Sequence, residues 1–216
     1  MLGELRRAYW RRRYAVLFYS LLLTLALAPL LTALHFSANF LQIFLAFNLL
    51  VAVLGVRGGR WRTILVPLAA VAIGLRAIPI GGSGELATGA LVIGGAVAVL
   101  AITGAVRFAL GSSVIGAEQV YAALSAYVLA GLFFGVLHWE VAAAWPGSIG
   151  EAGAGGLPTP LSLPTAMYYS FVTLATLGYG DVVPKSEVAR GLAIFEAVGG
   201  QLYIAVTIAR LVGARR

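Results

Sequence analysis

Apolar residues run along this chain in long blocks with few polar interruptions. Six blocks reach the length of about 20 residues that a helix needs to cross a ~30 Å hydrocarbon core. A shorter apolar segment, from Pro164 to Ala175, follows a loop rich in glycine and proline, and it can only enter the membrane and turn back. The pattern predicts an all-α membrane protein with six transmembrane helices and a re-entrant helix between the fifth and the sixth. We place the six spans at about 14–34, 38–56, 61–80, 86–109, 117–139 and 187–212.

Composition supports this prediction and excludes soluble classes of protein. Hydrophobic residues make up 61% of the 216 residues and charged residues 11%, which indicates a chain mostly immersed in lipid. The net charge of +7 is not gathered on one soluble face, and no nucleic-acid-binding signature accompanies it, so we expect no nucleic-acid partner. The chain has no cysteine, which excludes disulfides, thiolate metal sites and thiol nucleophiles. The first apolar block, from Tyr14, is longer than a signal-peptide core, so we expect it to be retained as a span.

The positions of the basic residues predict the orientation of the spans. Cytoplasmic flanks carry the excess of arginine and lysine. A cytoplasmic N-terminus puts twelve of the 15 basic residues on the inner side, so we expect an integral plasma-membrane protein with both termini in the cytoplasm. The arginine-rich N-terminus could bind anionic lipid headgroups, or it could serve only to orient the first span. The twelve residues are Arg6, Arg7, Arg11, Arg12, Arg13, Arg57, Arg60, Arg62, Arg107, Arg210, Arg215 and Arg216.

Turn-forming residues from Gly111 to Gly116 interrupt the apolar pattern once more. They predict two domains, a four-helix transmembrane domain over 1–111 and a second domain over 112–216.

The most informative run lies in the second domain and reads Thr-Leu-Ala-Thr-Leu-Gly-Tyr-Gly-Asp over 173–181. Its two glycines alternate with larger residues, so every second residue can take left-handed dihedrals and successive carbonyls can turn toward one axis. Such a row of carbonyls can replace the hydration shell of a potassium ion. The run resembles the signature of the potassium-channel superfamily, in which Thr-Val-Gly-Tyr-Gly forms the selectivity filter. The resemblance assigns ion binding to Thr176, Leu177, Gly178, Tyr179 and Gly180, with K⁺ held at the first four.

The resemblance also assigns residues that support the filter. Asp181 follows the filter and Thr173 precedes it. In the family, two aromatic residues of the pore helix brace the filter and bond to the aspartate, and the matching positions here are Tyr168 and Tyr169. The alternative for these tyrosines is a place in the aromatic belt at the membrane interface. The resemblance implies no cofactor. K⁺ is the ion that passes through the pore.

Residues 195–212 resemble the inner helix of short bacterial potassium channels, which suggests a prokaryotic member. Gly199 and Gly200 lie where the family has a hinge glycine, although small residues also allow close helix packing. Glu196 should point away from the central cavity, where we hypothesise that it tunes the filter from behind. The alternative is a carboxyl group satisfied by tyrosine or threonine hydroxyls of the pore helix. Helical spacing gives the cavity-facing set as Gln201, Ile204, Ala205 and Ile208.

The four-helix domain is expected to resemble a voltage-sensor domain without gating charges. A voltage sensor needs several arginines in its fourth helix, because moving one charge through 100 mV yields only ~2.3 kcal/mol. Residues 86–109 contain one arginine, Arg107. We therefore predict weak or absent voltage dependence.

One filter motif per chain implies that four chains surround one pore, so the expected assembly is a homotetramer. The predicted function is a potassium-selective channel that conducts passively. The alternative is a potassium-uptake transporter subunit, although such proteins usually carry four degenerate filters in one chain. An enzyme is not expected, because His35 and His138 are far apart and are predicted to be interfacial side chains near the outer membrane surface.

Overall fold

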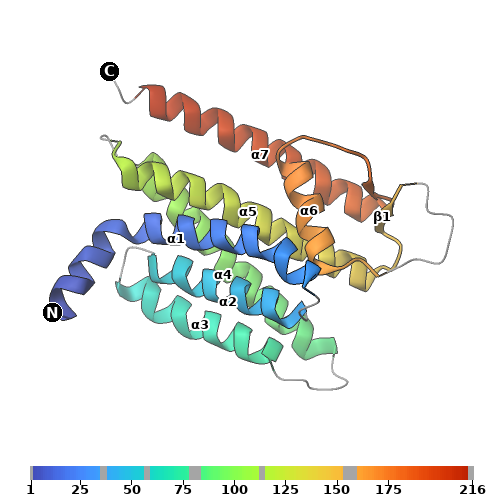
Figure 1. Ribbon diagram of the computed structural model, residues 1–216, viewed down its shortest axis with the longest axis horizontal. Coiled ribbons are helices and arrows are strands. Elements are labelled where there is room, and N and C mark those ends of the chain that lie inside the picture. Colours follow the sequence, from blue (N-terminus) through green and yellow to red (C-terminus); the bar gives the residue numbers. More distant parts are fainter. Residues whose placement is uncertain are drawn as a thin grey trace. The chain divides into compact units, whose positions relative to one another are not determined.

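The computed structural model of the protein describes residues 2–34, 38–55, 59–77, 84–111, 115–152 and 160–213. His35, Arg57, Arg215 and Arg216 lie outside the described residues, as do the side chains of Arg6, Arg7, Arg11, Arg60, Arg62 and Arg76. The elements in chain order are α1 (Leu2–Ala33), α2 (Ala38–Gly55), α3 (Gly59–Ala77), α4 (Gly84–Leu110), α5 (Ala117–Ala144), β1 (Ile149–Glu151), α6 (Leu163–Leu174), β2 (Val182–Pro184) and α7 (Glu187–Gly213) (Figure 1).

The chain is an α-helical membrane protein. Among the described residues, three helices are long and apolar enough to span a membrane, namely Leu91–Leu110 within α4, α5 and α7. The apolar parts of α2 and α3 are shorter, at Gln42–Gly55 and Thr63–Ala72. Helix α1 contains non-helical dihedrals at Arg12. Six spans therefore remain a prediction, although a helix is present at each predicted position.

The first compact unit comprises residues 1–129 and contains α1 to α4 and the first part of α5. Its core is built from aliphatic side chains such as Leu17, Leu21 and Leu65, which are almost fully buried. Polar residues inside the unit pair with one another. The buried amide of Asn48 accepts from the hydroxyl of Ser20 at 2.8 Å, a bond of the kind that holds helices together in lipid.

The unit boundary lies inside α5, whereas the sequence predicted a division at 111/112. The first part of α5 groups with α1 because Tyr14 donates its backbone N–H to Glu118 Oε2 at 3.1 Å and Tyr121 packs against Phe18 at 5.8 Å between ring centroids. The predicted turn does separate α4 from α5, and residues 112–114 within it lie outside the described residues.

The second compact unit, residues 130–216, holds the end of α5 together with α6, α7 and a two-stranded antiparallel sheet. Gly150 of β1 pairs with Val183 of β2, and Lys185 N donates to Ser148 O at 2.7 Å just beyond the sheet. The sheet joins the segment after α5 to the segment before α7. The sequence analysis did not predict these strands.

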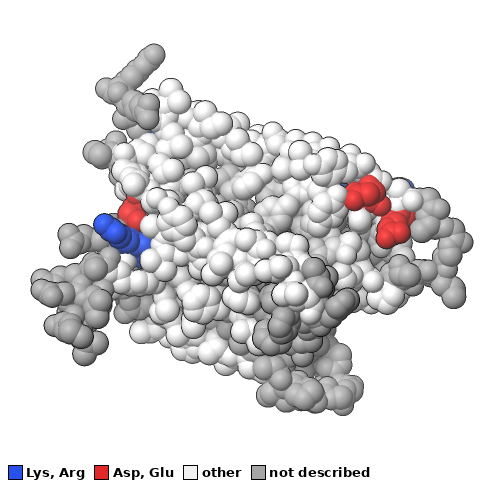
Figure 2. All heavy atoms as spheres, viewed as in Figure 1, with Lys and Arg blue, Asp and Glu red and all other residues white. Residues whose placement is uncertain are grey.

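Figure 2 shows where charge lies on one face of the molecule. On that face, the described acidic and basic side chains lie near the ends of the helices, and no charged atoms appear along the helices between these ends. This distribution is typical of helices that cross a hydrocarbon layer.

Candidate functional site

Helix α6 begins and ends where its sequence dictates. Ser162 caps it by accepting the backbone N–H of Thr165 at 3.2 Å, and Pro164 stands in the first turn, where its missing N–H costs nothing. The helix runs over 12 residues, which corresponds to ~18 Å at 1.5 Å per residue. The predicted helix from Pro164 to Ala175 is thus confirmed to within one residue.

Three glycines let α6 approach its neighbours closely. A Cβ added to Gly131 of α5 would lie 2.5 Å from the Phe171 ring, and one added to Gly135 would lie 3.0 Å from the Cα of Met167. On α7, a Cβ at Gly200 would meet the backbone oxygen of Leu174 at 2.8 Å. Gly200 is therefore a packing position, whereas a Cβ at its neighbour Gly199 would meet nothing within 4 Å.

The loop after α6 alternates its backbone handedness. The left-handed dihedrals predicted for the two glycines are present, with φ of 58° at Gly178 and 79° at Gly180. Thr176 shares them, with φ of 56°, which the sequence analysis did not predict because only glycine adopts this region without strain. Leu177 N donates to Val172 O at 2.9 Å, so the start of the loop is fixed to the last turn of α6.

Asp181 follows the loop and is held by two donors. The Tyr168 hydroxyl donates to Oδ2 at 2.8 Å, and the backbone N–H of Val182 donates to Oδ1 at 3.0 Å. The hydrogen bond from Tyr168 lowers the pKa of Asp181 below its ordinary value, because it favours the charged carboxylate. This is the contact that the resemblance implied for one of the two tyrosines.

Tyr169 lies elsewhere. It is buried and stands edge-on to the imidazole of His138, with 4.8 Å between ring centroids. Of the two tyrosines, Tyr168 is the one that bonds to the aspartate within one chain.

The loop and part of α7 share an open side. Leu177 and Tyr179 of the loop expose 56% and 67% of their surface, which is high for large side chains of this kind. Gln201 Nε2 lies 3.5 Å from Thr176 Oγ1, so this predicted cavity residue stands beside the start of the loop. The other predicted cavity residues differ in exposure: Ala205 and Ile208 are exposed, and Ile204 is half-buried.

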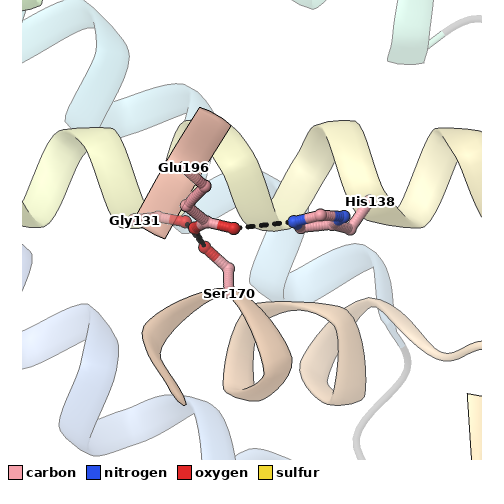
Figure 3. Close-up of polar contacts among 4 residues, drawn as sticks. All are labelled: Gly131, His138, Ser170 and Glu196. Carbon is pink, nitrogen blue, oxygen red and sulfur yellow. Dashed lines mark hydrogen bonds and ion pairs between the residues drawn. The ribbon is translucent and has the colours of Figure 1, made fainter. Parts of the chain in front are cut away.

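Glu196 lies on the buried side of α7, away from Gln201. Its Oε2 is 2.7 Å from His138 Nε2 of α5, and its Oε1 is hydrogen-bonded to the Ser170 hydroxyl of α6 (Figure 3). The predicted placement of His138 at the membrane interface is wrong, because the imidazole is fully buried against Glu196. The carboxyl group is satisfied by a serine and a histidine, whereas the sequence analysis considered only tyrosine and threonine.

The sequence carried a signal for one of the two partners. His138 lies in the fifth predicted span and Glu196 in the sixth, and ionisable residues inside a membrane generally pair with one another. Ser170 is the polar residue that follows the two tyrosines of the pore helix.

Glu196 stands between the other two side chains, since His138 Nε2 contacts its Oε2 and the Ser170 hydroxyl contacts its Oε1. Among the residues that the structure describes, no group of three or more His, Asp or Glu side chains could hold a metal ion.

Comparison with known proteins gives one matching family model and two related proteins. Residues 123–214 match a family model described as an ion channel. A stretch of 52 residues is 42% identical to the voltage-gated potassium channel Kch of Escherichia coli, and covers 24% of this chain and 12% of that protein. A stretch of 47 residues is 40% identical to a protein of Rhodopseudomonas palustris named as a candidate potassium channel, and covers 22% of this chain and 11% of the relative. The chain thus aligns with only about an eighth of each relative, and no solved structure matches it.

Proposed function

We propose that this chain is a potassium-selective channel that conducts K⁺ passively through a homotetrameric pore, because residues 123–214 match a family model described as an ion channel and both relatives are named as potassium channels. The observation that carries the proposal is the loop backbone, which has positive φ at Thr176, Gly178 and Gly180 but not at Leu177 and Tyr179 between them.

That alternation suits the chemistry of a dehydrated cation. A polypeptide whose residues alternate in handedness can direct successive carbonyl oxygens to the same side, as an extended strand cannot. Rings of such carbonyls replace the water around K⁺. The backbone oxygens of Thr176, Leu177, Gly178 and Tyr179 are the proposed ligands, with the Thr176 hydroxyl at one end of the row.

Exposure supports the assembly of four chains. Only 11% of the most apolar part of α7 is buried within the chain, against 50% for α5, and the loop itself is exposed. A single chain can place oxygens on one side of an ion only. Four copies around one axis would cover the open side of α7 and complete each ring of oxygens.

The proposed arrangement in the plasma membrane has six spans and cytoplasmic termini. Helix α6 would be re-entrant, with its carbonyl end directed at the pore centre, where the negative end of the helix dipole favours a cation. The non-helical loop beyond it is tolerated at that depth because it lines the ion path. The cluster of basic residues near the N-terminus would lie on the side of the anionic headgroups.

We propose that the channel has little voltage dependence, although the Escherichia coli relative is named as voltage-gated. The fourth predicted span has Arg107 as its one arginine. One charge moved through 100 mV supplies only ~2.3 kcal/mol per chain, too little for steep gating.

A potassium-uptake transporter subunit is the alternative. Such a protein would couple K⁺ movement to another ion or to an energy-supplying partner. Proteoliposomes loaded with K⁺ and diluted into a medium free of both potassium and sodium, at equal pH on the two sides, distinguish the two. A channel gives downhill K⁺ flux in either direction without a proton gradient, a sodium gradient or a nucleotide. A flux that requires any of these would contradict the proposal.

A further inference from the structure

Glu196 joins three helices of the second compact unit inside their apolar packing. It projects from α7, its two oxygens contact Ser170 of α6 and His138 of α5, and all three side chains are fully buried (Figure 3). The Ser170 hydroxyl also lies 2.7 Å from the backbone oxygen of Gly131 in α5. The side chains of His138, Glu196 and Ser170 and the backbone oxygen of Gly131 therefore form one continuous series of short polar contacts.

The single hydrogen on the Ser170 hydroxyl limits how the hydrogens can be placed along this series of contacts. Its hydroxyl carries one hydrogen but stands between two oxygens, Gly131 O and Glu196 Oε1. A carboxylate at Glu196 would leave one of the two contacts without a hydrogen. A protonated carboxyl group solves this, because Glu196 Oε1–H donates to Ser170 Oγ and Ser170 then donates to Gly131 O.

The imidazole of His138 gives an independent reason for the same arrangement. Its Nε2 bonds to Glu196, whereas its Nδ1 is buried and has no hydrogen-bond partner among the residues that the structure describes. An imidazolium would carry a charged N–H at Nδ1 with no acceptor, which is costly in an apolar interior. A neutral imidazole with its hydrogen on Nε2 leaves only a lone pair unpaired there, and it still donates to Glu196 Oε2.

We propose that His138, Glu196 and Ser170 form a neutral hydrogen-bond relay, with the proton on Glu196, that positions the pore helix behind the filter. The donors run in one direction, from His138 Nε2–H to Glu196 Oε2, from Glu196 Oε1–H to Ser170 Oγ, and from Ser170 Oγ–H to Gly131 O. Among the described residues, Tyr169 is a further titratable group that faces the relay, with its ring edge-on to His138.

The relay acts on the filter through α6. Ser170 lies two residues before Val172, whose backbone oxygen accepts the N–H of Leu177 at the start of the filter loop. Leu174 at the end of the same helix packs on Gly200, one turn from Glu196 on α7. A helix that loses the relay is free to shift, and Val172 O shifts with it. This positioning role rests on the proposed function, whereas the protonation state does not.

The substitution Glu196→Gln distinguishes a neutral relay from a buried ion pair between Glu196 and His138. An amide has the shape and the donor pattern of a protonated carboxyl group, since its NH₂ donates to Ser170 Oγ and its oxygen accepts from His138. We expect the E196Q protein to keep the melting temperature and the K⁺/Na⁺ permeability ratio of the wild type. E196A and S170A should each lower the melting temperature by several degrees and reduce the permeability ratio. Glu187→Gln, an exposed carboxyl on the same helix, is the matched control and should change neither measurement.

Spectroscopy tests the proton directly and does not depend on conduction. The infrared spectrum of the purified wild-type protein at neutral pH should contain the carbonyl stretch of a protonated carboxyl group, which E196Q lacks and E187Q keeps. The chain has two histidines, so a His35→Asn background leaves one imidazole in a ¹⁵N spectrum, and it should be neutral with its hydrogen on Nε2.

Opposite results would overturn the relay. An imidazolium signal, a missing carboxyl band, or an E196Q protein as unstable as E196A would show a buried ion pair instead. If the band and the tautomer are found in a protein that conducts no K⁺, the relay stands and the proposed channel function falls. If E196A is less stable but conducts with unchanged selectivity, the positioning role is wrong.

Discussion

The two sides of α6 differ in what covers them. On one side, Ala166, Tyr169 and Ser170 are buried, and the Ser170 hydroxyl bonds to Gly131 O of α5 and to Glu196 of α7 in the same chain. On the other side, Tyr168 and the residues of the following loop are exposed. The difference indicates a division of work. One chain covers this side of α6 by itself, whereas the ion path that we propose on the other side would be completed by further copies of the chain.

The largest effect is expected on the open side, from Gly178→Ala. The φ of 58° places an L-residue in the left-handed region at ~1–2 kcal/mol, and four chains would each carry this strain. We expect K⁺ flux in proteoliposomes to fall by at least about tenfold, the ratio that ~1.4 kcal/mol gives, while the helices remain folded.

Gly191→Ala is the matched control for this substitution. Gly191 is a helical glycine in α7 with nothing within 4 Å of an added Cβ, so its variant should conduct like the wild type. Wild-type flux in the Gly178 variant would show that the loop is not the ion path.

The second-largest effect is expected from Gly200→Ala on the buried side of α6, which we call the closed side. The added methyl group would lie 2.7 Å from Leu174 Cδ1 and 2.8 Å from its backbone oxygen, and overpacking of this kind costs about 1–3 kcal/mol. The melting temperature of the purified protein should fall by several degrees.

The neighbouring glycine provides both a control and a test of gating. Gly199→Ala meets open space and should leave the melting temperature unchanged. If Gly199→Ala reduces the open probability at constant stability, Gly199 is the hinge and Gly200 the packing position. Equal stability of the two variants would contradict the close contact at Gly200.

The closed and open sides also differ in how far the sequence predicts them. Helix α6 could be placed to within one residue because Ser162 and Pro164 are local signals for a helix start. The partners of Glu196 were missed because they come from α5 and from a serine 26 residues away, and no local pattern encodes that distance. The strands β1 and β2 have three residues each, too few for an alternating pattern, so they could not be predicted.

A smaller, pH-dependent effect is expected for Tyr168→Phe on the open side. The hydrogen bond from Tyr168 lowers the pKa of Asp181, so the stabilisation it provides is present above the unfolded-state pKa of about 3.9 and is lost as the pH falls through the lower folded-state pKa. Without the hydroxyl, the pKa of Asp181 rises, and K⁺ flux should decline at a higher pH during acidification than in the wild type. Identical pH profiles would show that the bond does not support the filter.

The smallest effect is expected for Glu187→Gln. Glu187 is the first residue of α7 and belongs to neither of the two sides of α6. Its carboxylate bonds to Arg190 at 2.8 Å, but both side chains are largely exposed. Exposed pairs contribute about 0–1 kcal/mol, so the melting temperature and the flux should stay near their wild-type values. A large loss of either would mean that this pair is covered in the assembled protein.

The reversal potential of single-channel or macroscopic currents through the purified protein in a planar bilayer tests the central claim most directly. With potassium as the permeant ion and sodium on both sides, the reversal potential should move by about 59 mV for each tenfold K⁺ gradient. A reversal potential that stays at zero under the potassium gradient, or that follows the sodium gradient, would contradict the account.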